Sequence, residues 1–263
     1  MNMRSLTGAE ICVLPDHEIP RVTKSGGSAD LFLQAEVMAR AGSVVFPQLY
    51  GVSNTNGYTM ERLQPQPAPL NFFGTAYRLF RVRDMLPLVW KWAPLDYIRA
   101  VRWQLETENW LTRSAPWLLP DFRRIYARKY CPECLIHGDP TLANVMLDDN
   151  LNLKLIDPAP PRFAVPQLPE VDLGKLLQSV AGWEHVLDPD WPEPQMDLIG
   201  DVVDDVVRIP SVLLTADLGP DIRGRAIFWG AFHCARIMVR YAQDPMLSGW
   251  GLRWSQRWLE MLK

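Results

Sequence analysis

The chain has 263 residues, of which 48% are hydrophobic and 22% are charged, so it is long enough to build two lobes with a substantial core. Its formal net charge of −3 gives no electrostatic basis for binding nucleic acid or a membrane surface. The sequence contains neither an apolar run of about 18 residues nor the apolar N-terminal core of a signal peptide, so we expect a cytoplasmic location.

The first 63 residues predict a small β-rich lobe with one helix. Short apolar or β-branched runs beside turn residues predict four strands, at 11–14, 19–24, 44–46 and 58–63. Ser28-Ala-Asp30 is suited to cap a helix that runs from Leu31 to Ala41 and ends at Gly42. The proline-rich segment 64–69 then predicts a linker to the second lobe.

Residues 64–263 predict a larger lobe that is mostly helical. The expected helices lie at 95–114, 120–129, 171–182, 197–207, 221–243 and from about 247 onward. Three tryptophans recur at every fourth position of the last helix, at Trp250, Trp254 and Trp258, which favours a packed stripe on one helix face. The two halves together predict an α+β fold with two lobes.

A β-hairpin is predicted between residues 145 and 156. Val145-Met-Leu147 and the segment 151–156 are short apolar runs, and the turn-rich Asp148-Asp-Asn150 separates them. Antiparallel pairing brings the start of the first strand opposite the end of the second. The residues that flank the hairpin on its two sides should therefore lie close together.

Three of the polar residues around this hairpin suit one kind of chemistry. Asn144 precedes the first strand, Asp157 follows the second, and Asp139 lies on the loop that enters the hairpin. Mg-dependent phosphoryl transfer needs a carboxylate near the acceptor hydroxyl and oxygen ligands for a metal bound to phosphates. Asp139 fits the first requirement, and Asn144 with Asp157 fits the second.

The order of these residues resembles a known superfamily. His137-Gly-Asp139, four further residues, Asn144 and the later Ile156-Asp157 resemble the catalytic loop and metal-binding aspartate of kinase-like proteins. Gly138 and Pro158 make the segment more similar to the aminoglycoside phosphotransferase and choline kinase branch of small-molecule kinases. The resemblance implies a bilobal protein-kinase-like fold and the use of ATP and Mg²⁺. It also implies transfer of the γ-phosphate to a hydroxyl of a sugar, polyol, amino alcohol or aminoglycoside.

The same resemblance implies that the first lobe binds the nucleotide. Lys24 would grip the phosphates of ATP, and Glu36 on the following helix would orient Lys24 by an ion pair. Arg21 competes with Lys24 for this role because it lies on the same predicted strand. The backbone between Glu61 and Leu63 occupies the position at which the family hydrogen-bonds adenine.

The sequence departs from the family pattern before Lys24, where no G-x-G-x-x-G motif occurs, so a shorter loop at 6–9 would have to close over the phosphates. A non-catalytic nucleotide-binding protein or scaffold therefore remains an alternative. A protein Ser/Thr kinase is a second alternative, although Gly138, Pro158 and the short segment before Asp172 count against it. A third is an unrelated α+β protein with a polar hairpin.

Two further patterns have both a functional and a structural interpretation. Four carboxylates share one predicted helix face and form either an acidic wall for a cationic substrate or a solvated surface: Asp197, Asp201, Asp204 and Asp205. Cys131 and Cys134 form a C-x-x-C unit, which is half of a zinc site, a redox pair or simply two thiols. We expect a small hydroxyl-bearing molecule as the partner, and the sequence indicates no oligomeric state.

Overall fold

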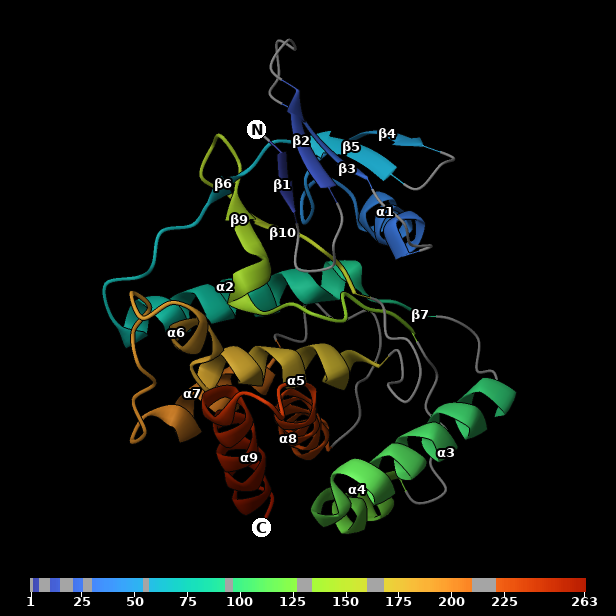
Figure 1. The fold of residues 1–263 in the computed structure, drawn as a ribbon, viewed down its shortest axis with the longest axis vertical. Helices are drawn as coiled ribbons and strands as arrows, with labels where there is room; N and C mark the ends of the chain where they lie inside the picture. The colour runs from blue at the N-terminus through green and yellow to red at the C-terminus, as the bar shows by residue number, and fades with distance from the viewer. Residues whose placement is uncertain are drawn as a thin grey trace.

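A small β-rich lobe lies above a larger helical lobe in the computed structural model (Figure 1). The model describes residues 2–4, 10–14, 21–25, 30–53, 57–92, 97–126, 134–159, 168–209 and 221–263. This arrangement confirms the predicted α+β fold with two lobes. None of the helices in these ranges is both long enough and apolar enough to cross a membrane.

The described strands of the small lobe form one antiparallel sheet in the order β1-β2-β3-β5-β4. Their bounds are Asn2–Arg4 for β1, Glu10–Leu14 for β2, Arg21–Ser25 for β3, Leu49–Ser53 for β4 and Gly57–Glu61 for β5. Helix α1 spans Asp30–Ala41, and Gly42 follows it with a φ of 81°, a backbone conformation that favours glycine at helix ends.

The strand predicted at 44–46 is wrong, because this segment forms a turn after α1. The N–H groups of Val45 and Phe46 donate to the carbonyl of Gly42, at 3.3 and 3.2 Å. Both side chains are nevertheless fully buried. These apolar side chains therefore belong to the core and not to a strand. A run of three apolar residues does not distinguish a strand from a buried turn.

The predicted hairpin is confirmed. Strands β9 (Val145–Leu147) and β10 (Leu153–Leu155) are antiparallel, with Val145 opposite Leu155. The predicted linker begins with a third strand of this sheet, β6 (Gln64–Pro65), which pairs with β9. A separate pair joins β7 (Lys91–Trp92) to β8 (Cys134–Leu135) just before the loop that enters the hairpin.

Helix α2 (Phe72–Val89) has no counterpart among the sequence predictions, and it runs between the small lobe and α5 (Figure 1). The Asn71 side chain caps its start by accepting the N–H of Gly74 at 3.0 Å. Gly74 and Pro87 lie within the helix and weaken its local signal, because both residues have poor helix propensity. Packing of the buried face of α2 compensates for the poor helix propensity of these two residues.

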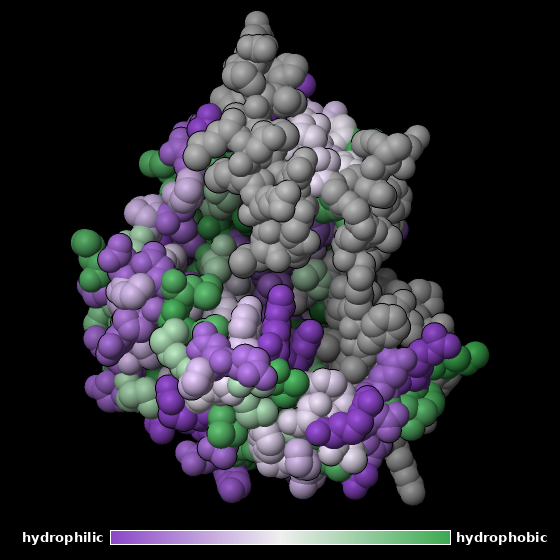
Figure 2. Space-filling view, viewed as in Figure 1, coloured by the Kyte–Doolittle hydropathy of each residue, from purple (hydrophilic) through white to green (hydrophobic). Residues whose placement is uncertain are grey.

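The other helices of the large lobe are α3 (Tyr97–Ser114), α4 (Leu119–Tyr126), α5 (Pro169–Val180), α6 (Trp183–Leu187), α7 (Ile199–Val207), α8 (Ile222–Arg240) and α9 (Pro245–Glu260). Helices α5 and α8 pack very closely at Gly174, where an added Cβ would lie 2.5 Å from the Cβ of Trp229. Trp250, Trp254 and Trp258 are buried, which confirms the packed stripe on α9. On the face seen in Figure 2, hydrophilic and hydrophobic residues are interleaved over the described part of this lobe.

Candidate active site

The loop that carries the predicted catalytic residues runs from His137 to Asn144 and is called loop 137–144 below. It follows β8 and the buried Ile136, and it ends in a single 3-10 turn, Leu142–Asn144, that leads into β9. Gly138 has a φ of 85°, so a side chain at this position would strain the backbone. The loop is thus fixed to the hairpin sheet at one end and to β8 at the other.

The start of loop 137–144 is held by Asp172 of α5. The fully buried carboxylate of Asp172 accepts the backbone N–H groups of His137 and Gly138, at 3.0 and 2.7 Å, and the indole N–H of Trp90 at 3.0 Å. Burial raises the pKa of Asp172 to about 6, although these three hydrogen bonds favour its charged form. Asp172 is therefore a structural support of the loop.

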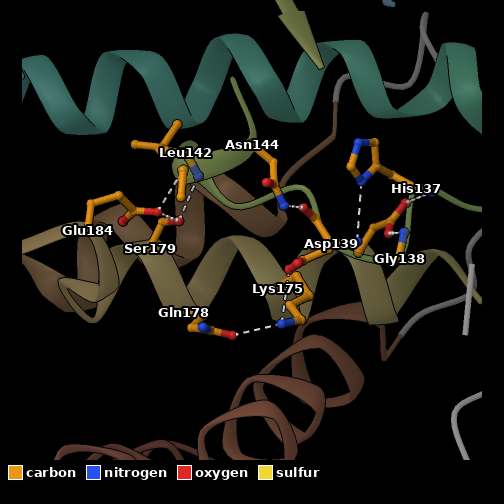
Figure 3. Close-up of polar contacts among 11 residues, drawn as sticks. His137, Gly138, Asp139, Leu142, Asn144, Lys175, Gln178, Ser179 and Glu184 are labelled. Carbon is orange, nitrogen blue, oxygen red and sulfur yellow. Dashed lines mark hydrogen bonds and ion pairs between the residues drawn. The ribbon is translucent and has the colours of Figure 1, made fainter. Parts of the chain in front are cut away.

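The end of loop 137–144 is held by Ser179 of α5 and Glu184 of α6 (Figure 3). The Ser179 hydroxyl accepts the N–H of Leu142 at 3.0 Å and donates to Glu184 Oε1 at 2.7 Å. The N–H of Ala143 donates to the same Glu184 oxygen at 3.2 Å. Sequence reasoning missed both supports, because neither belongs to a local motif, and a glutamate after a glycine-tryptophan pair carries no signal of burial.

Asp139, the predicted proton acceptor, is half-buried in the middle of the loop. Its Oδ1 lies 3.0 Å from the ammonium nitrogen of Lys175, and its N–H donates to His137 Nδ1 at 3.2 Å (Figure 3). Burial raises the pKa of Asp139, but the charge and hydrogen bond of Lys175, with smaller effects from His137 and Asn144, lower it further than burial raises it. The carboxylate is therefore ionised at neutral pH.

Asn144 and Asp157 lie on adjacent ends of the hairpin, as the register predicts. The N–H of Ile156 donates to the carbonyl of Asn144 at 2.9 Å, and the Asn144 amide group donates to the carbonyl of Asp139 at 2.8 Å. Asp157 follows with a φ of 52°, an uncommon value for a residue other than glycine. The structure thus brings the three predicted residues together on one loop and hairpin.

The donor set suits a hard divalent cation. Donation by its amide nitrogen fixes the orientation of Asn144 and leaves its side-chain oxygen for another partner, while Asp157 contributes a carboxylate. Mg²⁺ in phosphotransferase sites is held by one or two such oxygen ligands together with phosphates and water. Within the described ranges, no group of three or more His, Cys, Asp or Glu side chains is arranged so that it could hold a metal ion by itself.

Lys24 is the cation of the small lobe that reaches the hairpin. Its side chain is 1% exposed, and its Nζ lies 2.6 Å from Asp157 Oδ1 and 3.4 Å from the Gln34 side-chain oxygen. Arg21, the competing residue, is instead stacked over the ring of Tyr50 at 4.3 Å. The geometry therefore favours Lys24 over Arg21.

Two other predicted nucleotide contacts are only partly placed. Glu36 belongs to α1, but its side chain lies outside the described residues; among the described side chains of α1, Lys24 contacts Gln34. The N–H of Glu61 donates to the carbonyl of Gln48, and its carboxylate accepts the N–H of Gln48. Leu63 is buried just beyond β5. The loop predicted at 6–9 lies outside the described residues.

His137 is placed as a support of the loop. Its ring is fully buried and stacked on Phe46, with ring centres 5.6 Å apart. Burial lowers the pKa of His137 to about 4, so the ring is neutral at pH 7. Because Nδ1 accepts the N–H of Asp139, we assign the ring proton to Nε2.

The structure favours the structural interpretation of the acidic helix face. Asp204 and Asp205 of α7 lie within 2.6 and 3.5 Å of Arg223 and Arg208, respectively, on the protein surface. The valines on the opposite side of α7 are buried. Of the C-x-x-C unit, Cys134 is buried on β8, and Cys131 lies outside the described residues.

Comparison with known proteins identifies the fold. No family model and no curated protein matches the sequence. A solved glucosamine kinase in complex with glucosamine, ADP and inorganic phosphate matches with a TM-score of 0.68 and 14% identity over 98% of this chain and 81% of that one. Choline kinase LicA from Streptococcus pneumoniae matches with a TM-score of 0.57 and 11% identity over 100% of this chain and 92% of that one. A choline kinase from Cryptosporidium parvum Iowa II matches with a TM-score of 0.56 and 10% identity over 99% of this chain and 88% of that one.

At these identities the likeness shows the fold alone. The chain has the fold of small-molecule kinases of the protein-kinase-like superfamily. This confirms the fold and the resemblance predicted from the loop and hairpin residues.

Proposed function

We propose that the protein is an ATP- and Mg-dependent phosphotransferase that moves the γ-phosphate of ATP to a hydroxyl of a small molecule. The observation that carries this proposal is the hydrogen-bonded unit of Asp139, Asn144 and the strand end before Asp157, with Lys24 reaching it from the other lobe. The shared fold supports a kinase, and a glucosamine kinase that binds ADP supports the use of ATP.

In this reaction Asp139 orients the acceptor hydroxyl and takes its proton as the oxygen attacks the γ-phosphorus. The bond between that phosphorus and the bridging oxygen breaks, and ADP leaves with the bond's electron pair. Asn144 and Asp157 would hold Mg²⁺, which would neutralise charge on the phosphates. Lys24 moves from Asp157 to contact the phosphates, and Glu36 orients the Lys24 side chain. The backbone at Glu61 and Leu63 binds adenine.

The proposed nucleotide-binding lobe is 1–63, and 64–263 carries the catalytic loop and the acceptor site. The acceptor is a sugar, polyol, amino alcohol or aminoglycoside, and the location is cytoplasmic. Glucosamine and choline, named for the neighbouring kinases, are the first acceptors to test. The small-molecule kinases among the neighbours support this class over a protein kinase. The intact set of Asp139, Asn144 and Asp157 supports an active enzyme over a scaffold.

An ATP-consumption screen over sugars, polyols, amino alcohols and aminoglycosides tests the proposal. We expect Mg-dependent turnover with one class of acceptor, and a loss of about 100-fold or more in Asp139→Asn. The matched control is Asp121→Asn, which removes a surface carboxylate paired with Arg124 on α4 and should leave turnover intact. Turnover retained in Asp139→Asn would remove this residue from its assigned role.

A further inference from the structure

One face of α5 contacts loop 137–144 at three places. Asp172, Lys175 and Ser179 follow each other at spacings of three and four residues, so they project from the same side of the helix. They contact the start, the middle and the end of the loop in that order, and Figure 3 shows the contacts of Lys175 and Ser179. Asp172 and Ser179 accept backbone N–H groups of the loop, whereas Lys175 contacts the side chain of Asp139.

Lys175 is held firmly enough to orient that side chain. Its side chain is 14% exposed, and its Nζ lies 3.0 Å from Asp139 Oδ1 and 3.0 Å from the Gln178 side-chain oxygen. Gln178 is one turn further along α5 and neutral, so it restrains the ammonium group without competing for its charge. The helix itself cannot shift easily, because Gly174 is packed against the backbone of α8.

The groups that interact electrostatically with Asp139 come from its own loop and from two helices. They are His137 of the loop, Asp172 and Lys175 of α5, and the exposed Arg236 of α8. Within the described part of the chain, Lys175 is the cation in direct contact with the carboxylate. Lys175 faces Oδ1 and so does not occupy the second oxygen of Asp139, and the side chain of Asn144 also favours the charged form of this carboxylate.

We infer that Lys175 is a positioning residue for phosphoryl transfer, which holds one oxygen of Asp139 so that the other faces the acceptor hydroxyl. The inference rests on the proposed function, because it concerns the same site. Lys175 itself exchanges no proton in the step. The proton of the hydroxyl passes to Asp139, and the lysine fixes the direction from which it is taken.

A double-mutant cycle tests whether Lys175 acts through Asp139. The assay uses ATP with the acceptor found in the screen, or with water as the acceptor where the screen finds none. Under these conditions Lys175→Met should lower kcat about tenfold or more and leave the KM for ATP unchanged. In an Asp139→Asn background the same substitution should cause no further loss, because the group on which it acts is gone. Lys175→Arg, which keeps the cation, should restore most of the turnover. Equal losses in both backgrounds would overturn the inference.

A spectroscopic measurement tests the ion pair without reference to activity. An ammonium group held by two partners gives a protected signal in ¹H–¹⁵N spectra of the lysine side chains. We expect one such signal to disappear in Lys175→Met and in Asp139→Asn, and to persist in Lys154→Met. Lys154 is the matched control, because it is also buried and paired with an aspartate, Asp148, at 3.7 Å.

The outcomes separate the two claims. Persistence of every such signal in Asp139→Asn, or full turnover in Lys175→Met, overturns the inference while the proposed function stands. A wild-type protein that consumes no ATP overturns the proposed function, and with it any role of Lys175 in the reaction. Should Lys175→Met fail to fold, Lys175→Gln replaces it, because its side chain is polar and carries no charge.

Discussion

At the scale of single residues, the Asp172 carboxylate is the point at which α2, α5 and loop 137–144 meet. It accepts three hydrogen bonds in a site that water does not reach. A buried donor left without an acceptor costs about 1–3 kcal/mol. The stability of the loop therefore depends on a group that has no direct part in the chemistry.

We predict that Asp172→Ala lowers the free energy of unfolding by about 3–5 kcal/mol, because three buried donors lose their acceptor. Asp172→Asn should also destabilise, since its amide nitrogen would face backbone N–H groups. Urea unfolding followed by circular dichroism measures both changes. A loss below 1 kcal/mol, on the order of the change expected for the surface variant Asp121→Asn, would contradict the structural role.

His233 of α8 gives a pH-dependent prediction. Its ring is buried beside Trp229 and Phe232, and the backbone of Val171 is a hydrogen-bonding group beside it that favours its protonated form. Burial, with Lys175 and Arg236 nearby, lowers the pKa of His233 well below 6.5. As the pH falls below about 6.5, the unfolded chain takes up a proton that the folded chain refuses, so stability falls.

His233→Phe should therefore stabilise the protein, by about 1 kcal/mol at pH 7, and the gain should grow as the pH is lowered from 7 to 5. Thermal unfolding of both proteins across this range measures the difference. A gain that stays constant with pH would mean that the pKa of His233 is the same in the folded and the unfolded protein.

At the scale of elements, two glycines in helices predict opposite results for the same substitution. A Cβ at Gly174 of α5 would meet the Cβ and carbonyl carbon of Trp229 at 2.5 and 2.7 Å, and these atoms belong to the rigid interior of α8. Gly174→Ala should lower stability by about 1–3 kcal/mol. Gly200 of α7 has open space around the same position, so Gly200→Ala should raise stability by about 0.5 kcal/mol. Urea unfolding measures the stability of both variants. A loss of stability in both would contradict the packing argument.

The hairpin was predictable because its information is local. Two short apolar runs, a turn-rich centre and the rule of antiparallel pairing were enough to bring Asn144 close to Asp157. The short strand β4 and helix α2 escaped prediction, because their sequences lack clear periodicity and are decided by what packs against them. The supports Ser179 and Glu184 are contacts between distant segments, which no local pattern records.

At the scale of the whole molecule, the two lobes meet through contacts between the small lobe and the hairpin. The N–H of Leu155 donates to the carbonyl of Val45 at 2.8 Å, and Lys24 pairs with Asp157 across 133 positions of sequence. Only the resemblance to kinases indicated a role for Lys24, because no spacing rule links residues this far apart. The pair places the proposed nucleotide and metal contacts at the junction of the lobes.

ATP with Mg²⁺ should raise the melting temperature of the wild type, by an amount that grows with ligand concentration. Asp157→Ala should lower the melting temperature without ligand, since it leaves the buried Lys24 without its carboxylate. The variant should also lose the Mg-dependent part of the increase. Differential scanning fluorimetry with ATP alone, with Mg²⁺ alone and with both ligands measures these changes in melting temperature. If the Mg-dependent increase in melting temperature is unchanged in Asp157→Ala, this aspartate is excluded as a metal ligand.

Both acids at the candidate site already have a lysine from the chain itself, Lys24 for Asp157 and Lys175 for Asp139. If the proposed function holds, a free divalent ion would have to displace an ammonium group at a site where these pairs already balance the local charge. A metal–nucleotide complex would instead bring phosphates that give Lys24 a new partner. The resting pairs therefore predict that metal and nucleotide bind together, as one complex, and that no ion is bound beforehand.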